Sequence, residues 1–258
     1  MRPVTLITGA SAGLGVEFAR QCAARGEELA LVARRRDRLE ALAAELGTAV
    51  HVFVADLSLE GAAASLIAEL AAEGLGVGTL INNAGFGLAG PFADRPPARQ
   101  SEMIALNVRA LVELCHLALP AMRARGTGAI CNVASTAAFQ PGPNMAVYYA
   151  SKAFVLSFTE ALHHELKGSG IRVSALCPGP TATEFGAVAE AQMPSSRLIT
   201  AAAADVVRAG LKGLDRNKAV VIPGWGNKAG ANASRFLPRA VVRRIIGSLK
   251  MGKPPQAN

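Results

Sequence analysis

Short apolar runs rich in β-branched residues alternate along the chain with longer stretches of helical periodicity. Seven of these runs have the length and composition of buried strands, and they lie at 3–8, 28–33, 50–55, 77–81, 128–133, 171–177 and 219–222. A first helical pattern ends near residue 25, and others lie at 37–46, 57–73, 99–123, 145–167 and 201–214. This alternation predicts an α/β fold: a single doubly wound domain whose seven-stranded parallel sheet is covered by helices on both faces.

The last part of the chain departs from this alternation, so we expect a main domain at 1–225 and a basic C-terminal extension at 226–258. Within 238–250 one helical face carries Val241, Val242, Ile245, Ile246 and Leu249, and the other carries Arg239, Arg243, Arg244 and Lys250. Such a basic amphipathic helix docks on its own domain or a partner subunit, or adsorbs to an anionic membrane surface. Nucleic acid is not expected as a partner, because aromatic residues are not interleaved with the basic ones.

Composition and charge narrow the class of protein. The chain has 258 residues and 51% hydrophobic residues, without a signal peptide pattern or an uninterrupted apolar run of membrane-spanning length. Its four cysteines have neither metal-ligand spacing nor the density of a disulfide framework, so we expect reduced cysteines, no metal site and a cytoplasmic location. The net charge of +8 comes from the end of the chain, since nine basic and no acidic residues follow residue 215.

A glycine-rich turn after the first strand indicates a phosphate site. Gly9, Gly13 and Gly15 lie between the strand at 3–8 and the following helix, whose N-terminal N–H groups can bind a phosphate. After the second strand, Arg34 and Arg35 stand where an acidic residue would favour NAD and an arginine favours the 2′-phosphate of NADP. The alternative for the two arginines is a solvated basic start to the next helix.

Polar residues follow three more strands at the edge of the sheet where ligands bind in doubly wound folds. Asp56 could accept a hydrogen bond from an adenine amino group or cap the helix expected near residue 58. Asn83 and Ser135 follow other strands, and on their own a turn or cap residue is the ordinary interpretation. Asn107 interrupts an apolar helix, where a buried amide needs hydrogen-bond partners.

Tyr148 and Lys152 are the candidate chemical pair. They are four residues apart in the expected helix at 145–167 and therefore share a face, and Tyr149 is a rival three residues from the lysine. An ammonium beside a phenol lowers the phenol pKa towards neutrality, which makes the pair a usable proton donor and acceptor. Taken alone, the spacing is common on ordinary helix faces.

The ordered set of motifs resembles the short-chain dehydrogenase/reductase family across roughly 3–222. It comprises the glycine turn, Asn82-Asn83-Ala84-Gly85, Asn107, Ser135, Tyr148-x-x-x-Lys152 and Pro178-Gly179. The resemblance implies a Rossmann-type domain in which Tyr148 is the catalytic acid and Lys152 lowers its pKa and holds the nicotinamide ribose. It also implies that Ser135 hydrogen-bonds the substrate carbonyl and that Asn107 holds a water molecule of a proton relay.

The same resemblance implies an NADP(H)-dependent oxidoreductase acting on a carbonyl or secondary alcohol. The residues that match cofactor contacts are Gly9, Ser11, Gly13, Leu14, Gly15, Arg34, Arg35, Asp56, Leu57, Asn83, Ala84, Gly85, Tyr148, Lys152, Pro178, Gly179, Thr181 and Thr183. The segments 86–97 and 184–200 are mostly apolar or small, which favours a hydrophobic small-molecule substrate and makes 184–200 the expected substrate loop. The family implies a homodimer or homotetramer, and the alternative function is a non-catalytic dinucleotide-binding regulator or scaffold.

Overall fold

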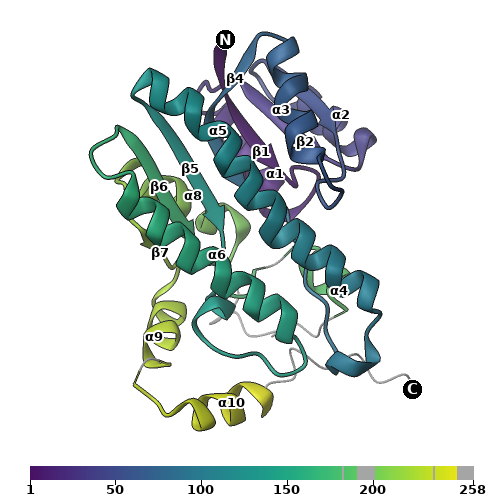
Figure 1. The fold of residues 1–258 in the computed structure, drawn as a ribbon, viewed down its shortest axis with the longest axis vertical. Helices are drawn as coiled ribbons and strands as arrows, with labels where there is room; N and C mark the ends of the chain where they lie inside the picture. Colours follow the sequence, from purple (N-terminus) through teal and green to yellow (C-terminus); the bar gives the residue numbers. More distant parts are fainter. Residues whose placement is uncertain (182, 191–200, 235, 249–258) are drawn as a thin grey trace.

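The computed structural model describes residues 1–181, 183–190, 201–234 and 236–248, and it contains the predicted parallel sheet (Figure 1). The strands are β1 (Arg2–Thr8), β2 (Leu29–Ala33), β3 (Val50–Val54), β4 (Leu75–Asn82), β5 (Gly128–Val133), β6 (Ile171–Leu176) and β7 (Val220–Val221). They pair in parallel in the order β3-β2-β1-β4-β5-β6-β7. The order reverses direction between β1 and β4, and a crevice for ligands opens at such a switch point.

Helices cover both faces of the sheet. One layer consists of α1 (Gly13–Ala23), α2 (Arg36–Glu45) and α8 (Ala203–Asp215), and the other of α3 (Ala62–Ala72), α5 (Leu111–Arg125) and α6 (Ala146–Glu165). Figure 1 shows α5 and α6 crossing in front of the sheet. The predicted doubly wound α/β fold is therefore confirmed.

The strand sequences explain the two layers. In β1, Leu6 packs into the core on the α5 side and Ile7 into the core on the α1 side, and both side chains are fully buried. Strands buried on both faces read as continuous apolar runs rather than as alternating ones, which is why the sequence pattern located them.

The helix expected at 99–123 is longer and less regular than its pattern suggested. It begins as α4 (Pro97–Ile104), passes through a π-helical segment (Ala105–Ala110) and continues as α5. By length and composition alone, the helix Pro97–Arg125 could cross a membrane, although the sequence has no uninterrupted apolar run of that length. In the fold its apolar side packs on β4 and β5 as part of the core.

Two expectations about helix positions need correction. The helix predicted from residue 57 begins only at Ala62, after Gly61 in the left-handed conformation, because residues 56–59 form turns instead. The C-terminal part contains the predicted α10 (Arg239–Ser248) but also α9 (Trp225–Ala233), which the sequence pattern did not predict. Of the expected loop 184–200, residues 185–188 form α7 (Phe185–Val188), and 191–200 lie outside the described residues, as do Leu249 and Lys250. Single-turn 3-10 helices are η1 (Phe92–Asp94) and η3 (Thr136–Phe139).

All four cysteines are buried and unpaired. Burial raises the pKa of the Cys115, Cys131 and Cys177 thiols to about 12, and it raises the pKa of Cys22 further. The cysteines are therefore apolar packing residues, as their sequence context predicted.

Candidate functional site

A cleft of about 810 Å³ runs along the carboxyl ends of the strands, at the switch point between β1 and β4. Every residue matched to a cofactor contact or a catalytic role lines it, with two exceptions, Gly15 and Asn107. Both exceptions are buried behind the wall of the cleft. The sequence motifs, spread over 175 positions from Gly9 to Thr183, thus meet at one surface.

The glycine turn forms the floor at one end of the cleft. Gly9 and Gly13 have positive φ angles of 67° and 56°, the left-handed region that favours glycine. Helix α1 begins at Gly13 without a side-chain cap, so its first amide groups remain available to a phosphate. A Cβ atom on Gly15 would lie 2.1 Å from the Gly9 carbonyl oxygen, so Gly15 allows the helix to approach the strand.

Two arginines make the rim beside this turn cationic. Arg35 donates from its guanidinium to the Ser11 side-chain and main-chain oxygens at 3.1–3.3 Å, and it lies 3.3 Å from the Glu184 carboxylate. Arg34 lies 3.7 Å from the Asp56 carboxylate and 3.5 Å from Glu102. Because these pairs are substantially exposed, a phosphate could replace the carboxylates as partner at little cost.

Asp56 makes a local turn rather than a helix cap. Its Oδ1 accepts hydrogen bonds from the Ser58 backbone N–H at 3.0 Å and from the Ser58 hydroxyl at 2.6 Å, and Ser58 lies four residues before α3 begins. Partial burial alone would raise the pKa of this carboxyl, but the Ser58 hydrogen bonds and the Arg34 charge outweigh it and hold the pKa below its usual value. The carboxylate stays in the cleft wall, where an adenine contact remains a prediction.

The amide of Asn83 joins the two strand ends at the switch point. Its Nδ2 donates to the Thr8 carbonyl at 2.9 Å and the Gly9 carbonyl at 3.2 Å, and its backbone N–H donates to the Thr8 hydroxyl. Gly85 follows, and a Cβ atom there would lie 2.9 Å from the Asn107 Oδ1. The Asn-Asn-Ala-Gly sequence therefore brings the backbone against both the turn and the interior of the site.

Asn107 ties three elements together from the interior. Its side chain exchanges two hydrogen bonds with the Phe86 backbone, at 2.9 and 3.1 Å, and donates to the Ser151 hydroxyl on α6 at 3.1 Å. It lies inside the π-helical segment, and π-bulges in helices are frequent at functional sites. The side chain is only 1% exposed, so the predicted contact with a water molecule stays a prediction.

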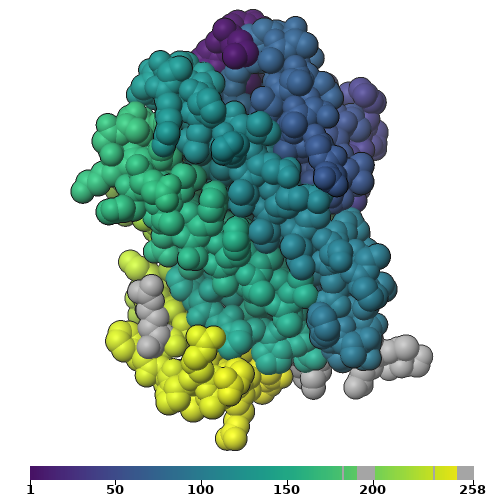
Figure 2. All heavy atoms as spheres, viewed as in Figure 1, coloured from purple at the N-terminus to yellow at the C-terminus, as the bar shows by residue number. Residues whose placement is uncertain are grey.

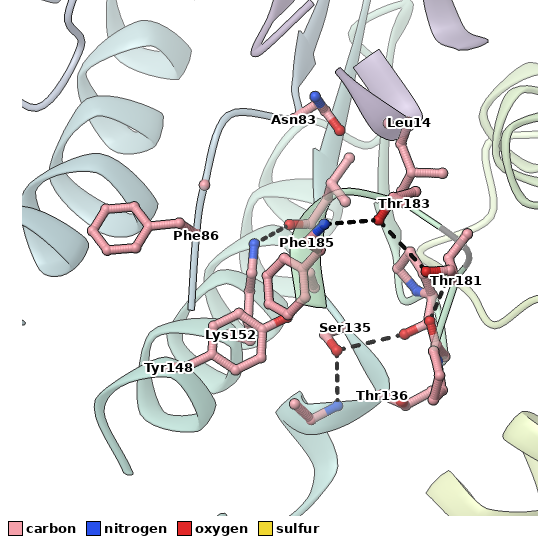
Figure 3. A pocket seen from close by; sticks show the side chains of 18 of the residues that line it. Leu14, Asn83, Phe86, Ser135, Thr136, Tyr148, Lys152, Thr181, Thr183 and Phe185 are labelled. Atoms are coloured by element: carbon pink, nitrogen blue, oxygen red, sulfur yellow. Dashed lines mark hydrogen bonds between the residues drawn. The ribbon is translucent and has the colours of Figure 1, made fainter. Parts of the chain in front are cut away.

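Ser135, Tyr148 and Lys152 meet where the cleft enters its apolar end (Figure 3). Ser135 follows β5, and its hydroxyl accepts from the Ala137 N–H at 3.1 Å and lies 3.5 Å from the Pro178 carbonyl oxygen. Lys152, on α6 one turn after Tyr148, donates from Nζ to the Val133 carbonyl at 2.8 Å. The tyrosine and the lysine thus project from one helix towards the end of β5.

The titration of this pair differs from the sequence expectation. Burial raises the pKa of the Tyr148 phenol to about 12, and the opposing effect of the Ser135 hydroxyl is smaller. Burial also lowers the pKa of Lys152 to about 8. The expectation that the Lys152 ammonium lowers the pKa of the Tyr148 phenol towards neutrality is wrong for the protein without a bound cofactor. Burial has the largest effect on the phenol pKa, and the Lys152 Nζ donates to the Val133 carbonyl instead.

The segment after β6 supplies another part of the cleft wall and packs on the glycine turn. Pro178, Gly179, Thr181 and Thr183 all line the cleft, and the Thr183 side chain packs on the first residue of α1, Gly13. Thr183 Oγ1 also accepts from the Phe185 N–H at 3.3 Å, which connects this wall to α7. The cleft therefore passes from the phosphate turn to the catalytic candidates between two backbone segments.

Comparison with known sequences identifies the family. The sequence model of the short chain dehydrogenases matches residues 3–194. The chain belongs to the short-chain dehydrogenase family. It is therefore an oxidoreductase that binds a nicotinamide cofactor and acts on a small molecule.

Among curated short-chain dehydrogenases, the sulfoacetaldehyde reductase 2 of Chromohalobacter salexigens is 43% identical over 189 residues, which are 72% of this chain and 75% of that protein. A short-chain dehydrogenase from Sphingobium yanoikuyae, solved in complex with NADPH, is 35% identical with a TM-score of 0.80, and the match covers 99% and 98% of the two chains. The bulky-bulky ketone specific alcohol dehydrogenase of Comamonas testosteroni is 29% identical with a TM-score of 0.75, covering 99% and 96%.

Part of the cleft of this short-chain dehydrogenase was not anticipated from sequence. Its apolar end includes Phe86 and Phe185, which belong to the segments 86–97 and 184–200 expected to shape the pocket. It also includes residues whose place in the cleft was not predicted: Met145, Tyr149, Leu237, Val242, Ile245 and Ile246. No spacing rule singles out the C-terminal residues, because a helical pattern identifies an apolar face without identifying what that face contacts.

Proposed function

We propose that this short-chain dehydrogenase uses NADPH to reduce the carbonyl group of a bulky, apolar substrate. The observation that carries the proposal is the composition of the cleft along its length. Arg34 and Arg35 stand at one end, Ser135, Tyr148 and Lys152 stand further along, and apolar side chains enclose the other end.

The residues at the cationic end suit a nucleotide with an additional phosphate. The uncapped start of α1 and the positive-φ glycines suit its pyrophosphate, and the two guanidinium groups suit its 2′-phosphate. The NADPH bound to the similar Sphingobium yanoikuyae enzyme supports this choice of cofactor. When bound, NADPH supplies the hydride for the carbonyl carbon.

The chain's own residues then control the proton and the developing charge. The raised pKa keeps Tyr148 protonated at neutral pH, so its hydroxyl can donate to the carbonyl oxygen. The Ser135 hydroxyl lies beside it and donates a second hydrogen bond to that oxygen as negative charge forms. Lys152 holds ribose hydroxyls of the cofactor and stabilises the phenolate left on Tyr148, and Asn107 holds α6 in register with the Phe86 loop.

Removing both arginines should change the cofactor preference. In Arg34→Ala/Arg35→Ala we expect the Kd for NADPH to rise by roughly 10- to 100-fold, or about 1.4–2.7 kcal/mol in total, because the two exposed guanidinium groups exchange carboxylate partners for the phosphate. The Kd for NADH should change by less than about threefold, because NADH has no 2′-phosphate. Thermal-shift titrations with both nucleotides measure the two constants.

Arg36→Ala is the matched control, since Arg36 belongs to the same arginine run but pairs with Glu40 and does not line the cleft. A wild-type protein that binds NADH more tightly than NADPH would refute the cofactor assignment. A wild-type protein that binds NADPH but oxidises none of it with a panel of apolar ketones and aldehydes would refute the substrate assignment.

The rate of reduction should depend on pH through Lys152. Its pKa of about 8 means that it is mostly charged at pH 7 and neutral above pH 9. Since Tyr148 keeps its proton throughout this range, we expect kcat for ketone reduction to be level from pH 6 to 7 and to fall above about pH 8. A stopped-flow pH profile measures this, and a rate that stays level to pH 10 would contradict a role for the lysine charge.

The names of two similar enzymes indicate different classes of substrate. The Chromohalobacter salexigens relative is named for a small anionic aldehyde, whereas the Comamonas testosteroni enzyme is named for bulky ketones and matches this chain over 99% of its length. The apolar end of the cleft favours the second class. The charged residues that line the described cleft are Arg34, Arg35, Asp56, Lys152 and Glu184, and none besides Lys152 belongs to the catalytic or apolar part.

A further inference from the structure

The C-terminal extension forms a wall of the cleft, although it lies beyond the part of the chain that matches the family. The family match ends at residue 194, whereas α9 and α10 span residues 225–248. These two helices form one end of the molecule in Figures 1 and 2, where they are coloured yellow. Their attachment is specific: the Ser234 hydroxyl donates to the Phe139 carbonyl oxygen at 3.0 Å, and Asn227 packs against Gly179.

Helix α10 has two faces with different surroundings. Val242 and Ile246, one turn apart, line the cleft, and Val242 is only 5% exposed. Arg239, Arg243 and Arg244 are exposed on the outside. Of the apolar face predicted from the sequence, Val242 and Ile246 therefore dock on the protein's own domain, whereas Val241 and Ile245 remain exposed. Adsorption of the helix to a membrane stays a prediction.

The apolar face of α10 contacts the hydrophobic cluster that contains Tyr148. Ile246 packs against the cluster that contains Phe86, Met145, Tyr148 and Tyr149. The Phe185 ring packs against the same cluster, with its centroid 5.2 Å from that of Tyr148. A carbonyl group placed at the Tyr148 hydroxyl would thus have its substituents near residues of α7 and α10, which both line the cleft.

From this geometry we infer that Val242 and Ile246 contact the apolar part of the substrate and set the size of the group that the enzyme accepts. This inference rests on the proposed function and adds the specificity-determining residues to it. Aliphatic side chains suit an alkyl or aryl substituent, and their size matters because a difference of one methylene in an apolar pocket changes specificity by about 10- to 200-fold.

The test compares a bulky ketone, valerophenone, with a small aldehyde, propanal, both reduced with NADPH. We expect Ile246→Phe to lower the ratio of kcat/KM for valerophenone to that for propanal by roughly 10- to 100-fold, because the added ring occupies the space of the ketone substituent. Val241→Phe is the matched control, since Val241 is on the same helix, is exposed and does not line the cleft. Its ratio should stay within about twofold of the wild-type ratio, well below the discrimination expected of a pocket contact.

Melting curves show whether the substituted proteins fold. If Ile246→Phe does not fold, Ile246→Val removes one methylene of contact with the ketone substituent, about 0.8 kcal/mol, and should lower the same ratio by about threefold to fourfold. Equal ratios in the Ile246 variant and the Val241 control, with an active enzyme, would overturn the inference and leave the proposed function intact.

A wild-type enzyme that reduces neither compound would instead overturn the proposed function. Calorimetric binding of valerophenone to the NADP-loaded protein then decides the inference separately. Weaker binding to the Ile246 variant than to the Val241 control supports the contact with α10, and equal binding overturns it.

Discussion

Replacing Tyr148 with phenylalanine is expected to lower kcat for ketone reduction by roughly 10²- to 10⁴-fold, the range typical of a lost general acid. The substitution removes one hydroxyl and keeps the ring, which packs on Phe185 and Tyr149. The fold and the nucleotide end of the cleft should therefore be preserved, with the Kd for NADPH within about threefold of wild type because no phosphate contact is touched. Single-turnover absorbance measurements of NADPH consumption, together with fluorescence titration of NADPH, separate the two effects.

Tyr149→Phe is the natural comparison. Tyr149 also lines the cleft and is the only other tyrosine in the chain, but it lies three rather than four residues before Lys152. If Tyr148→Phe kept nearly full activity, or if Tyr149→Phe lowered kcat as much as Tyr148→Phe does, the assignment of the proton donor would be wrong.

Replacing Gly15 with alanine is expected to disrupt the phosphate turn. The added Cβ would lie 2.1 Å from the Gly9 carbonyl oxygen and 2.8 Å from the Asn83 amide nitrogen, and a backbone atom cannot yield as a flexible side chain can. Overpacking of this kind costs about 3 kcal/mol of unfolding free energy, the upper part of the usual range. For a chain of this size that corresponds to a melting temperature lower by roughly 6–12 °C. Binding of NADPH should weaken as well, because Gly9 belongs to the cleft.

Gly47→Ala provides the matched control for this change. A Cβ at Gly47 would meet nothing within 4 Å, and the position does not have a positive φ angle. Its unfolding free energy should stay within about 0.5 kcal/mol of wild type, as for most surface substitutions. Calorimetry of the two alanine variants tests the argument, and equal melting temperatures would show that the turn tolerates a side chain.

The sequence was most informative where local pattern and burial agree. Strands such as β5 lie at the predicted positions because a parallel strand is apolar on both faces, so a continuous run marks its full length. The start of α3 was misplaced because a favourable helical composition does not register the turn that Asp56 and Ser58 make. Helix α9 was missed because two of its nine residues are glycine and two are asparagine, and both residue types have low helix propensity.

The candidate site also has features that could be predicted from sequence and features that could not. Residues that follow strands could be placed together from sequence, because the carboxyl ends of parallel strands meet at one edge of the sheet. The pKa of Tyr148 could not be predicted from sequence, since it depends on how completely the phenol is desolvated and on the Lys152 hydrogen bond to Val133. The contact of α10 with the cleft could not be predicted either, because it depends on the path of the chain between the main domain and α10.

The burial of the four cysteines has a practical consequence. Only thiolates react readily with maleimides and iodoacetamides, and with pKa values of about 12 or higher the native thiols hold almost none at pH 7. A single cysteine introduced on the solvent side of α10, for example at Arg243, would carry a fluorescent or spin label without removal of any native cysteine. The emission or the mobility of such a label would report whether the surroundings of the C-terminal helix change during turnover.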